Sequence, residues 1–204
     1  MEQGLSPDTI RKNRMKFLLI VLLFVLPVVV ALTLKLTNWH PQSTGNYGTL
    51  VQPARPPVPI QFRTVDGQAA SEKVFAGTWN LVVVTDGSCN SVCERNLFAI
   101  RQIHIAQGKN QPRVRRILIS ARPQADLSRV IKHYPEMTVL TADPDALEVV
   151  RNWTRSEKDG NDLSGSRIFV VDPLGNYMMY YNPDYNPAGM RKDLARLLRV
   201  SHIG

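Results

Sequence analysis

Residues 79–93 read WNLVVVTDGSCNSVC, an apolar run followed by two closely spaced cysteines. Its first part, Trp79 to Thr85, is an apolar and β-branched run, which is typical of a strand buried on both faces. Asp86-Gly87-Ser88 then ends the strand, because these residues favour turns. Apolar residues recur at helical spacing from about Asn90 to Gln107, which predicts a helix directly after the strand. The stretch therefore predicts a strand–turn–helix unit with two cysteines at the turn.

Further strands and helices alternate along the rest of the chain. The predicted strands cover 60–65, 114–120, 137–141, 167–171 and 177–181, and the predicted helices cover 124–133, 143–153 and the segment that begins at Asn186-Pro187. Residues 71–75 fit a short helix or a strand. This order predicts a mixed sheet with flanking helices on both faces. Because the order ends in an antiparallel hairpin and a helix, we expect a thioredoxin-like α/β fold.

An apolar segment near the N-terminus predicts one transmembrane helix. Phe17 to Leu34 contains 18 residues without a charge, which is long enough to cross the hydrocarbon core of a bilayer. Four basic residues, Arg11, Lys12, Arg14 and Lys16, precede the segment. The positive-inside rule therefore places the N-terminus in the cytoplasm and the C-terminal part across the membrane. A cleaved signal peptide is the alternative, but its apolar region is usually shorter and ends in a small-residue cleavage site.

The predicted domain organisation follows from this anchor. We expect a cytoplasmic N-terminus over 1–16, a transmembrane anchor over 17–36 and an extracytoplasmic domain over 60–204. Residues 37–59 lie between them and contain Pro53, Pro56, Pro57 and Pro59. Because proline favours extended polyproline conformations, this segment is predicted to be a Pro-rich spacer.

The charge distribution argues against a nucleic-acid partner. The chain carries a net charge of +8, and five of its 25 basic residues but only two of its 17 acidic residues lie before Trp39. The remainder is only mildly basic, whereas a nucleic-acid binder concentrates its basic residues in a dense patch. We expect Arg113, Arg115 and Arg116 to lie on a solvated face, with contact to an acidic partner or to lipid headgroups as the alternative.

The only two cysteines, Cys89 and Cys93, are the candidate site residues. If both lie in the first turn of the predicted helix, their spacing of four places them on one face, close enough for a disulfide or for shared binding of a metal ion. The unpaired amide groups of a helix N-terminus stabilise a thiolate, which is the reactive form in disulfide exchange and the form that binds Cu(I). A structural disulfide is the alternative. Its loop of about five residues stabilises by only about 2 kcal/mol in the entropy model.

Three segments together resemble the SCO/SenC proteins. They are Gly77 to Val84, the C-x-x-x-C pair, and Val170-Val171-Asp172-Pro173-Leu174-Gly175-Asn176, and Phe62-x-x-x-Asp66-Gly67 also fits the family's N-terminal hairpin. The resemblance covers roughly residues 50–200. It implies a membrane-anchored, thioredoxin-like protein that helps to assemble the copper centre of cytochrome c oxidase. It also implies that Cys89 and Cys93 are a redox pair or ligands of Cu(I).

The chain departs from the family pattern at two positions. Asn90 follows the first cysteine, where family members usually have proline. The family's third copper ligand is a histidine, and the equivalent position here is about Ser164, with no histidine nearby. The four histidines, His40, His104, His133 and His202, lie elsewhere in the sequence. Because two thiolates hold Cu(I) but form a poor Cu(II) site, the sequence favours thiol–disulfide chemistry over copper carriage.

Three functional hypotheses remain open at this point. The first is an assembly factor that acts on the copper-site cysteines of a respiratory oxidase subunit. It would reduce them, with Cys89 as the attacking thiol and Cys93 as the resolving thiol, or it would pass copper as Cu(I) through Cys89 and Cys93. The second is a general periplasmic thiol–disulfide oxidoreductase, and the third is a redox-inactive membrane scaffold subunit. The short acidic N-terminus does not resemble a transit peptide, so we expect a bacterial inner membrane with the C-terminal domain in the periplasm.

Overall fold

The computed structural model describes residues 7–37, 45–71, 73–86, 89–121, 124–156, 163–201 and 203. It divides into two units, 1–45 and 46–204. The first unit contains α1 (Pro7–Leu36). The second unit contains β1 (Thr49–Arg55), β2 (Arg63–Thr64), β3 (Trp79–Thr85), α2 (Ser91–Ile105), η1 (Gly108–Arg113), β4 (Val114–Ser120), α3 (Gln124–His133), β5 (Thr138–Thr141), α4 (Pro144–Trp153), β6 (Ser164–Val171), β7 (Tyr177–Tyr181) and α5 (Pro187–Val200).

Helix α1 is long and apolar enough to cross a membrane over Ile10–Leu36. It begins at Pro7, ten residues before the predicted start of the anchor, and therefore includes the basic residues that precede the apolar run. Pro27 lies inside the helix. A membrane helix tolerates proline because neighbouring groups can satisfy the freed backbone.

The second unit is built on a seven-stranded mixed sheet with the order β1-β7-β6-β3-β4-β5-β2. Strands β3, β4 and β5 are parallel to one another. On the other side of β3, β6 runs antiparallel to β3, and β7 runs antiparallel to β6. All seven residues of β3 are buried, because the strand lies at the centre of the sheet and is covered on both faces. The mixed sheet and the doubly buried strand are confirmed.

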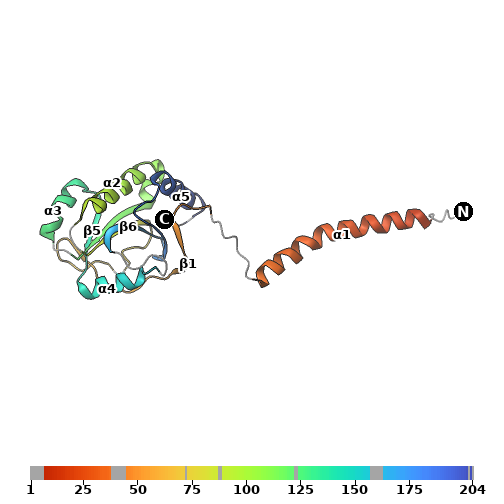
Figure 1. Cartoon of the computed structure of the whole chain (residues 1–204), viewed down its shortest axis with the longest axis horizontal. Helices are drawn as coiled ribbons and strands as arrows, with labels where there is room; N and C mark the ends of the chain where they lie inside the picture. Colours follow the sequence, from red (N-terminus) through yellow and green to blue (C-terminus); the bar gives the residue numbers. More distant parts are fainter. Residues whose placement is uncertain are drawn as a thin grey trace. The chain divides into compact units, whose positions relative to one another are not determined.

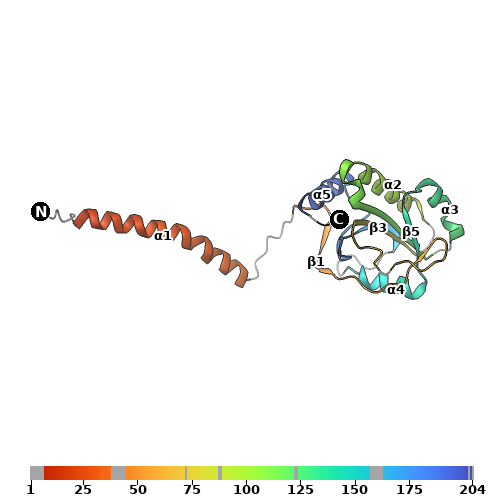
Figure 2. The ribbon, with the colours of Figure 1, turned by 180° about the vertical axis from the view of Figure 1, so that it is seen from behind.

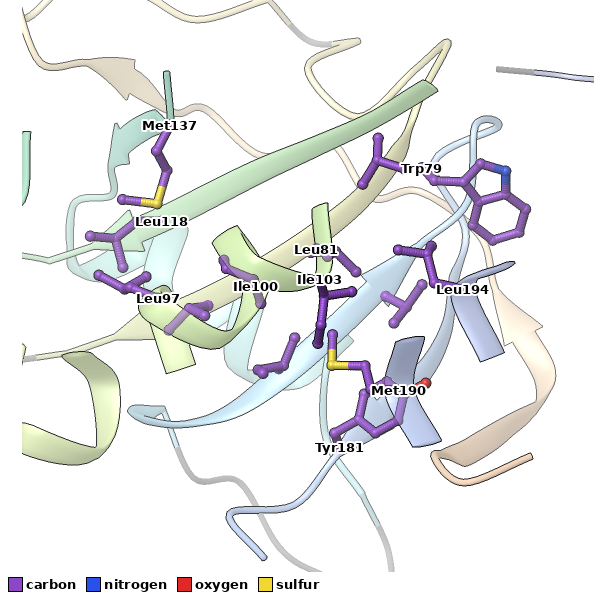
Figure 3. Close-up of a cluster of buried hydrophobic side chains, with 14 of the residues drawn as sticks. Trp79, Leu81, Leu97, Ile100, Ile103, Leu118, Met137, Tyr181, Met190 and Leu194 are labelled. Atoms are coloured by element: carbon purple, nitrogen blue, oxygen red, sulfur yellow. The ribbon is translucent and has the colours of Figure 1, made fainter. Parts of the chain in front are cut away.

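Helices cover both faces of the sheet (Figures 1 and 2). Apolar residues of α2, α3 and α5 pack on one face with Leu81 and Leu118, as Figure 3 shows for α2 and α5. Helix α4 packs on the other face, where Val150 and Trp153 contact a second apolar cluster. Asp143 caps α4 and accepts a hydrogen bond from the backbone N–H of Ala146, as expected of an Asp-Pro helix start.

The structure corrects the predicted spacer over 37–59. Residues Thr49–Arg55 form β1, which pairs with β7 at one edge of the sheet. The folded unit therefore begins at Asn46 instead of residue 60. Proline is compatible with this strand because an edge strand leaves some backbone N–H groups outside the ladder. The predicted strand over 60–65 is also shorter, since only Arg63 and Thr64 pair with β5, and residues 73–77 form turns.

The three arginines near the start of β4 do not form a solvated face. Arg113 donates hydrogen bonds to the carbonyl oxygens of Leu198 and Ser201, and it thereby caps the C-terminal end of α5. The Arg116 side chain is only 4% exposed and forms an ion pair with Glu136. Burial lowers the pKa of Arg116, and Glu136 acts in the opposite direction. Arg115 donates a hydrogen bond to the carbonyl oxygen of Val74, so all three side chains connect parts of the fold.

Candidate functional site

The candidate site lies where β3 ends and α2 begins. Cys89 and Cys93 form a disulfide, with their Cα atoms 5.1 Å apart. Cys89 lies outside the helix, because the side chain of Asn90 caps α2 by accepting hydrogen bonds from the backbone N–H groups of Val92 and Cys93. The condition that both cysteines lie in the first helical turn is therefore not met. The pair instead joins the residue before the cap to the first turn of the helix.

Asn90 also changes the electrostatics expected at the helix start. The unpaired amide groups of a helix N-terminus can stabilise a thiolate. Here the amide groups of Val92 and Cys93 already donate to the Asn90 Oδ1 atom, at 3.0 and 2.9 Å. These two groups are therefore engaged with the cap instead of facing a cysteine sulfur.

The two cysteines differ in their exposure to solvent. Cys93 is fully buried and belongs to the apolar cluster beneath α2, whereas Cys89 is only partly buried at the edge of that cluster. A reacting group from outside can approach the sulfur of Cys89 more readily than the sulfur of Cys93. Cys89 is therefore the more exposed residue of the disulfide, and Cys93 is the enclosed one.

The first residues of β6 cover Cys93. Ser164 pairs with Thr85 at the end of β3, and Gly165 follows with φ +80°. A Cβ atom at Gly165 would lie 2.6 Å from the Cys93 Cβ atom, so no side chain fits there. The backbone of β6 thus closes directly over the buried sulfur.

Asn96 holds this covering segment in place. It is completely buried, and its side-chain amide donates hydrogen bonds to the carbonyl oxygens of Gly165 and Ser166, at 2.9 and 3.0 Å. Its Oδ1 atom has no hydrogen-bond partner within the part of the chain that the structure describes. Sequence analysis missed Asn96 and Gly165. The glycine between two serines at the start of a strand was the available signal, because such glycines often mark a close backbone approach.

The described residues do not fit a three-donor copper site. Within those residues no group of three His, Cys, Asp or Glu side chains is placed to hold a metal ion. Ser164, which lies at about the position where the resemblance implies a histidine ligand, begins β6 beside Gly165. The donor set at the site therefore consists of two sulfur atoms, which in this structure are joined in a disulfide.

The described histidines serve other roles. His104 lies near the end of α2, and its Nε2 atom is 3.1 Å from the carbonyl oxygen of Gln111. Burial lowers the pKa of His104, and the charge of Arg116 lowers it further. His133 lies at the end of α3, with Nδ1 2.9 Å from the carbonyl oxygen of Arg129. His40 and His202 lie outside the described residues.

Comparison with solved structures confirms the predicted resemblance to SCO/SenC proteins at the level of the fold. Copper-bound ScoI of Bradyrhizobium japonicum matches with a TM-score of 0.53 and 23% identity over 69% of this chain and 98% of that chain. Copper-bound yeast Sco1 matches with a TM-score of 0.60 and 14% identity over 72% and 94%. BsSco, described as having a disulfide switch and as a member of the Sco family of cytochrome c oxidase assembly proteins, matches with a TM-score of 0.50 and 18% identity over 73% and 96%.

Sequence comparisons identify the family directly. No curated protein matches the chain. The family model described as transmembrane-like, thioredoxin-like, C-terminal domain matches residues 79–201, from the first residue of β3 to the residue after α5. This match confirms the thioredoxin-like fold and extends over more than half of the chain. The chain therefore belongs to this family of transmembrane-like proteins with a thioredoxin-like C-terminal domain.

Proposed function

We propose that this chain is a membrane-anchored assembly factor for a respiratory oxidase, acting by thiol–disulfide exchange through Cys89 and Cys93. The carrying observation is the disulfide at the start of α2, with Cys93 buried and Cys89 partly exposed. Thiol–disulfide exchange needs one sulfur that a partner can reach and a second that resolves the mixed disulfide. The different burial of Cys89 and Cys93 supports this division of roles.

In the proposed reaction the reduced form of the chain reduces a disulfide in its partner. The Cys89 thiolate attacks one partner sulfur, which forms a mixed disulfide and releases the other partner sulfur as a thiolate. The Cys93 thiolate then attacks the Cys89 sulfur and releases the second partner thiolate. Two electrons pass to the partner, and the chain is left with the Cys89–Cys93 disulfide found in the structure. An external dithiol must reduce the chain before the next cycle.

The proposed partner is an oxidase subunit that presents its copper-site cysteines at the membrane. The support is the fold shared with BsSco, described as one of the cytochrome c oxidase assembly proteins, together with the apolar helix α1. We propose that α1 crosses a bacterial inner membrane with the N-terminus in the cytoplasm and the C-terminal domain in the periplasm. The basic residues before the apolar run support this orientation.

Transfer of Cu(I) is the second candidate function. Its support is that similar folds, ScoI and Sco1, have been solved with copper bound. Two thiolates are soft ligands suited to Cu(I). The absence of a third donor among the described residues favours the redox function, because a two-sulfur site lacks the imidazole that Cu(II) prefers.

The decisive experiment traps the mixed disulfide. The reduced full chain in detergent is mixed with a soluble oxidase fragment whose copper-site cysteines are oxidised, and the products are analysed by mass spectrometry after alkylation. The wild type should yield a reduced fragment, and Cys93→Ser should accumulate a mixed disulfide through Cys89. Cys89→Ser should yield neither product. If the fragment stays oxidised in the presence of the wild type, the redox proposal is wrong.

Three further measurements separate the alternatives. Anaerobic Cu(I) loading of the wild type beyond the level of Cys89→Ser/Cys93→Ser would support copper transfer. A disulfide potential below about −300 mV would contradict disulfide exchange by either an assembly factor or a general oxidoreductase, since structural disulfides lie in that range. Full oxidase activity in cells that carry only the double-serine variant would identify the chain as a redox-inactive scaffold.

A further inference from the structure

The outer face of α5 carries a dense group of positive charges. Its inner face is buried through Met190, Leu194 and Leu198. At 3.6 residues per turn, the four basic residues of the helix fall within a sector of about 140° on the opposite side. They are all exposed: Arg191, Lys192, Arg196 and Arg199. We call these four residues the cationic face of α5.

No acidic residue of α5 neutralises this face. The only acid in the helix, Asp193, is buried and accepts hydrogen bonds from the backbone N–H groups of Tyr47 and Gly48 and from the Tyr181 hydroxyl group. Arg191, Lys192 and Arg199 form no ion pair with another residue in the described ranges. Three of its four side chains, Arg191, Lys192 and Arg199, are therefore open to an external anion.

The first residues of the folded unit contact this same helix. The backbone N–H groups of Tyr47 and Gly48 lie 2.7 and 3.0 Å from the Asp193 Oδ2 atom. The Tyr47 ring packs against Gly189, where any Cβ atom would overlap it, and the Lys192 ammonium group lies 5.6 Å from the ring centroid. Only nine residues, 37–45, separate the end of α1 from the start of this unit at Asn46.

Exposed apolar side chains accompany the cationic face. Tyr47 packs beside Lys192 and is 53% exposed, and Val200 at the end of α5 is 66% exposed. Arg113 holds this end of the helix through the carbonyl oxygens of Leu198 and Ser201. Basic side chains near a membrane surface are attracted to anionic headgroups, and exposed aromatic residues are favoured at the membrane–water interface.

We infer that the cationic face of α5 binds the headgroups of anionic phospholipids in the membrane that holds α1. This inference rests on the proposed membrane anchoring. The charges favour anionic headgroups over zwitterionic ones, and the short connection to α1 starts from α5 itself. An acidic protein would match the charges equally well. Lipid is favoured because the short connection to α1 joins the folded unit at this helix. Lipid binding would give the tethered domain a preferred orientation.

The inference is tested with the full chain in nanodiscs. An Ala195→Cys variant places a fluorophore within the cationic face, and labelling is selective because the native cysteines form a disulfide. The lipids carry a nitroxide on their headgroups, so they quench a fluorophore that touches the membrane surface. We expect stronger quenching in discs that contain phosphatidylglycerol than in discs of phosphatidylcholine alone. A label at Asp145→Cys on α4, which packs on the opposite face of the sheet, should show no such difference.

Two charge-matched double variants test the role of the arginines. Arg191→Gln/Arg199→Gln should lower about 25-fold the ratio of molecules with α5 on the membrane surface to molecules with α5 away from it. The reason is that each basic side chain near an anionic surface contributes about fivefold. Lys73→Gln/Lys132→Gln removes two exposed charges outside α5 and should leave the quenching unchanged. Salt at 1 M, where the Debye length is about 3 Å, should also remove the difference between the two lipids.

The results that overturn the inference are distinct from a failure of the anchor. Equal quenching of the Ala195→Cys label in the two lipids would contradict lipid binding, as would equal effects of the two double variants. An acidic protein as the true partner would give this result, because the discs contain no such protein. Failure of the chain to co-elute with the discs in gel filtration would instead show that α1 is not a membrane anchor.

Discussion

At the scale of single residues, the site depends on how closely β6 approaches Cys93. Gly165 has a positive φ and leaves no space for a Cβ atom, and the Asn96 side-chain amide donates to the carbonyl oxygens of Gly165 and Ser166. The buried sulfur is therefore enclosed by backbone on the side where the resemblance leads one to expect a histidine.

A Gly165→Ala substitution should destabilise the chain in two ways. The positive φ costs about 1–2 kcal/mol for a residue with a Cβ atom, and the overlap with Cys93 costs about 1–3 kcal/mol more. Gly67→Ala is the matched control, because Gly67 has φ +77° but no atom within 4 Å of the added Cβ. Urea unfolding of the detergent-solubilised chain measures both. Equal losses for the two variants would show that the contact with Cys93 is unimportant.

Asn90 is the second residue on which the local geometry depends. Asn90→Ala removes the cap of α2 and should lower the free energy of unfolding by about 1 kcal/mol. Asn90→Ser keeps a capping oxygen and should retain most of the stability. Both values come from urea titrations followed by circular dichroism. A stable alanine variant would contradict the assigned role of the Asn90 side chain.

At the scale of elements, two polar residues hold helix ends and strand ends together. Asp193 on α5 binds the segment before β1 and the Tyr181 hydroxyl group of β7. Burial raises the pKa of Tyr181, and the neighbouring Asp193 carboxylate raises it further. His104 connects the end of α2 to η1 through the Gln111 carbonyl oxygen. Asp193 thus connects segments that are distant in sequence, whereas His104 connects two helices that follow each other along the chain.

Asp193→Ala should be strongly destabilising. It leaves two backbone N–H groups and a buried hydroxyl group without their acceptor, and each unsatisfied buried donor costs about 1–3 kcal/mol. Asp193→Asn keeps an acceptor oxygen and should lose less stability. Thermal unfolding of the solubilised chain compares the two variants. If they melt at the same temperature as the wild type, the buried acid does not hold β1 to α5.

Stability should depend on pH through His104. Its pKa is lowered in the folded chain from the ordinary value of 6.5, mainly because the ring is partly buried. Below pH 6.5 the unfolded chain binds a proton at His104 that the folded chain does not yet bind. The free energy of unfolding therefore falls as the pH decreases from 6.5 toward the lowered pKa. His104→Gln should therefore show a smaller loss of stability than the wild type between pH 7.5 and 5.5 in urea titrations. Equal losses would contradict this role.

At the scale of the whole molecule, the boundary of the folded unit has practical consequences. Strand β1 covers the edge of β7, and Arg55 donates a hydrogen bond to the Trp153 carbonyl oxygen while the Trp153 indole N–H donates to the Pro56 carbonyl oxygen. These contacts connect the segment predicted to be a spacer to both β7 and α4. The segment is therefore part of the folded unit.

A fragment of residues 46–204 should fold cooperatively, whereas a fragment of residues 60–204 should not. The shorter fragment lacks β1, which exposes an unpaired edge of β7 to solvent and to aggregation. Near-UV circular dichroism and light scattering during thermal unfolding distinguish the two. Identical cooperative transitions would show that β1 adds little to the fold.

Local signals in the sequence were sufficient for most of the sheet and the helices. The apolar run of Trp79–Thr85, the Asp143 cap and the hairpin turn before Tyr177 each act within a few residues, and the corresponding elements appear where they were predicted. Strand β1 was missed because its proline and its neighbours have the composition of a linker. Its partner strand, β7, is distant in the sequence, and pairing with it leaves no periodic pattern in β1.

The cysteine pair, its position after a buried strand and the apolar helix near the N-terminus could be predicted from the sequence. These features depend on residue type and on contacts between near neighbours. The enclosure of the Cys93 sulfur could not be predicted in this way, because Gly165 reaches Cys93 from a segment distant in sequence. The same holds for the start of the folded unit, since Tyr47 and Gly48 donate to the Asp193 carboxylate from the opposite end of that unit in sequence.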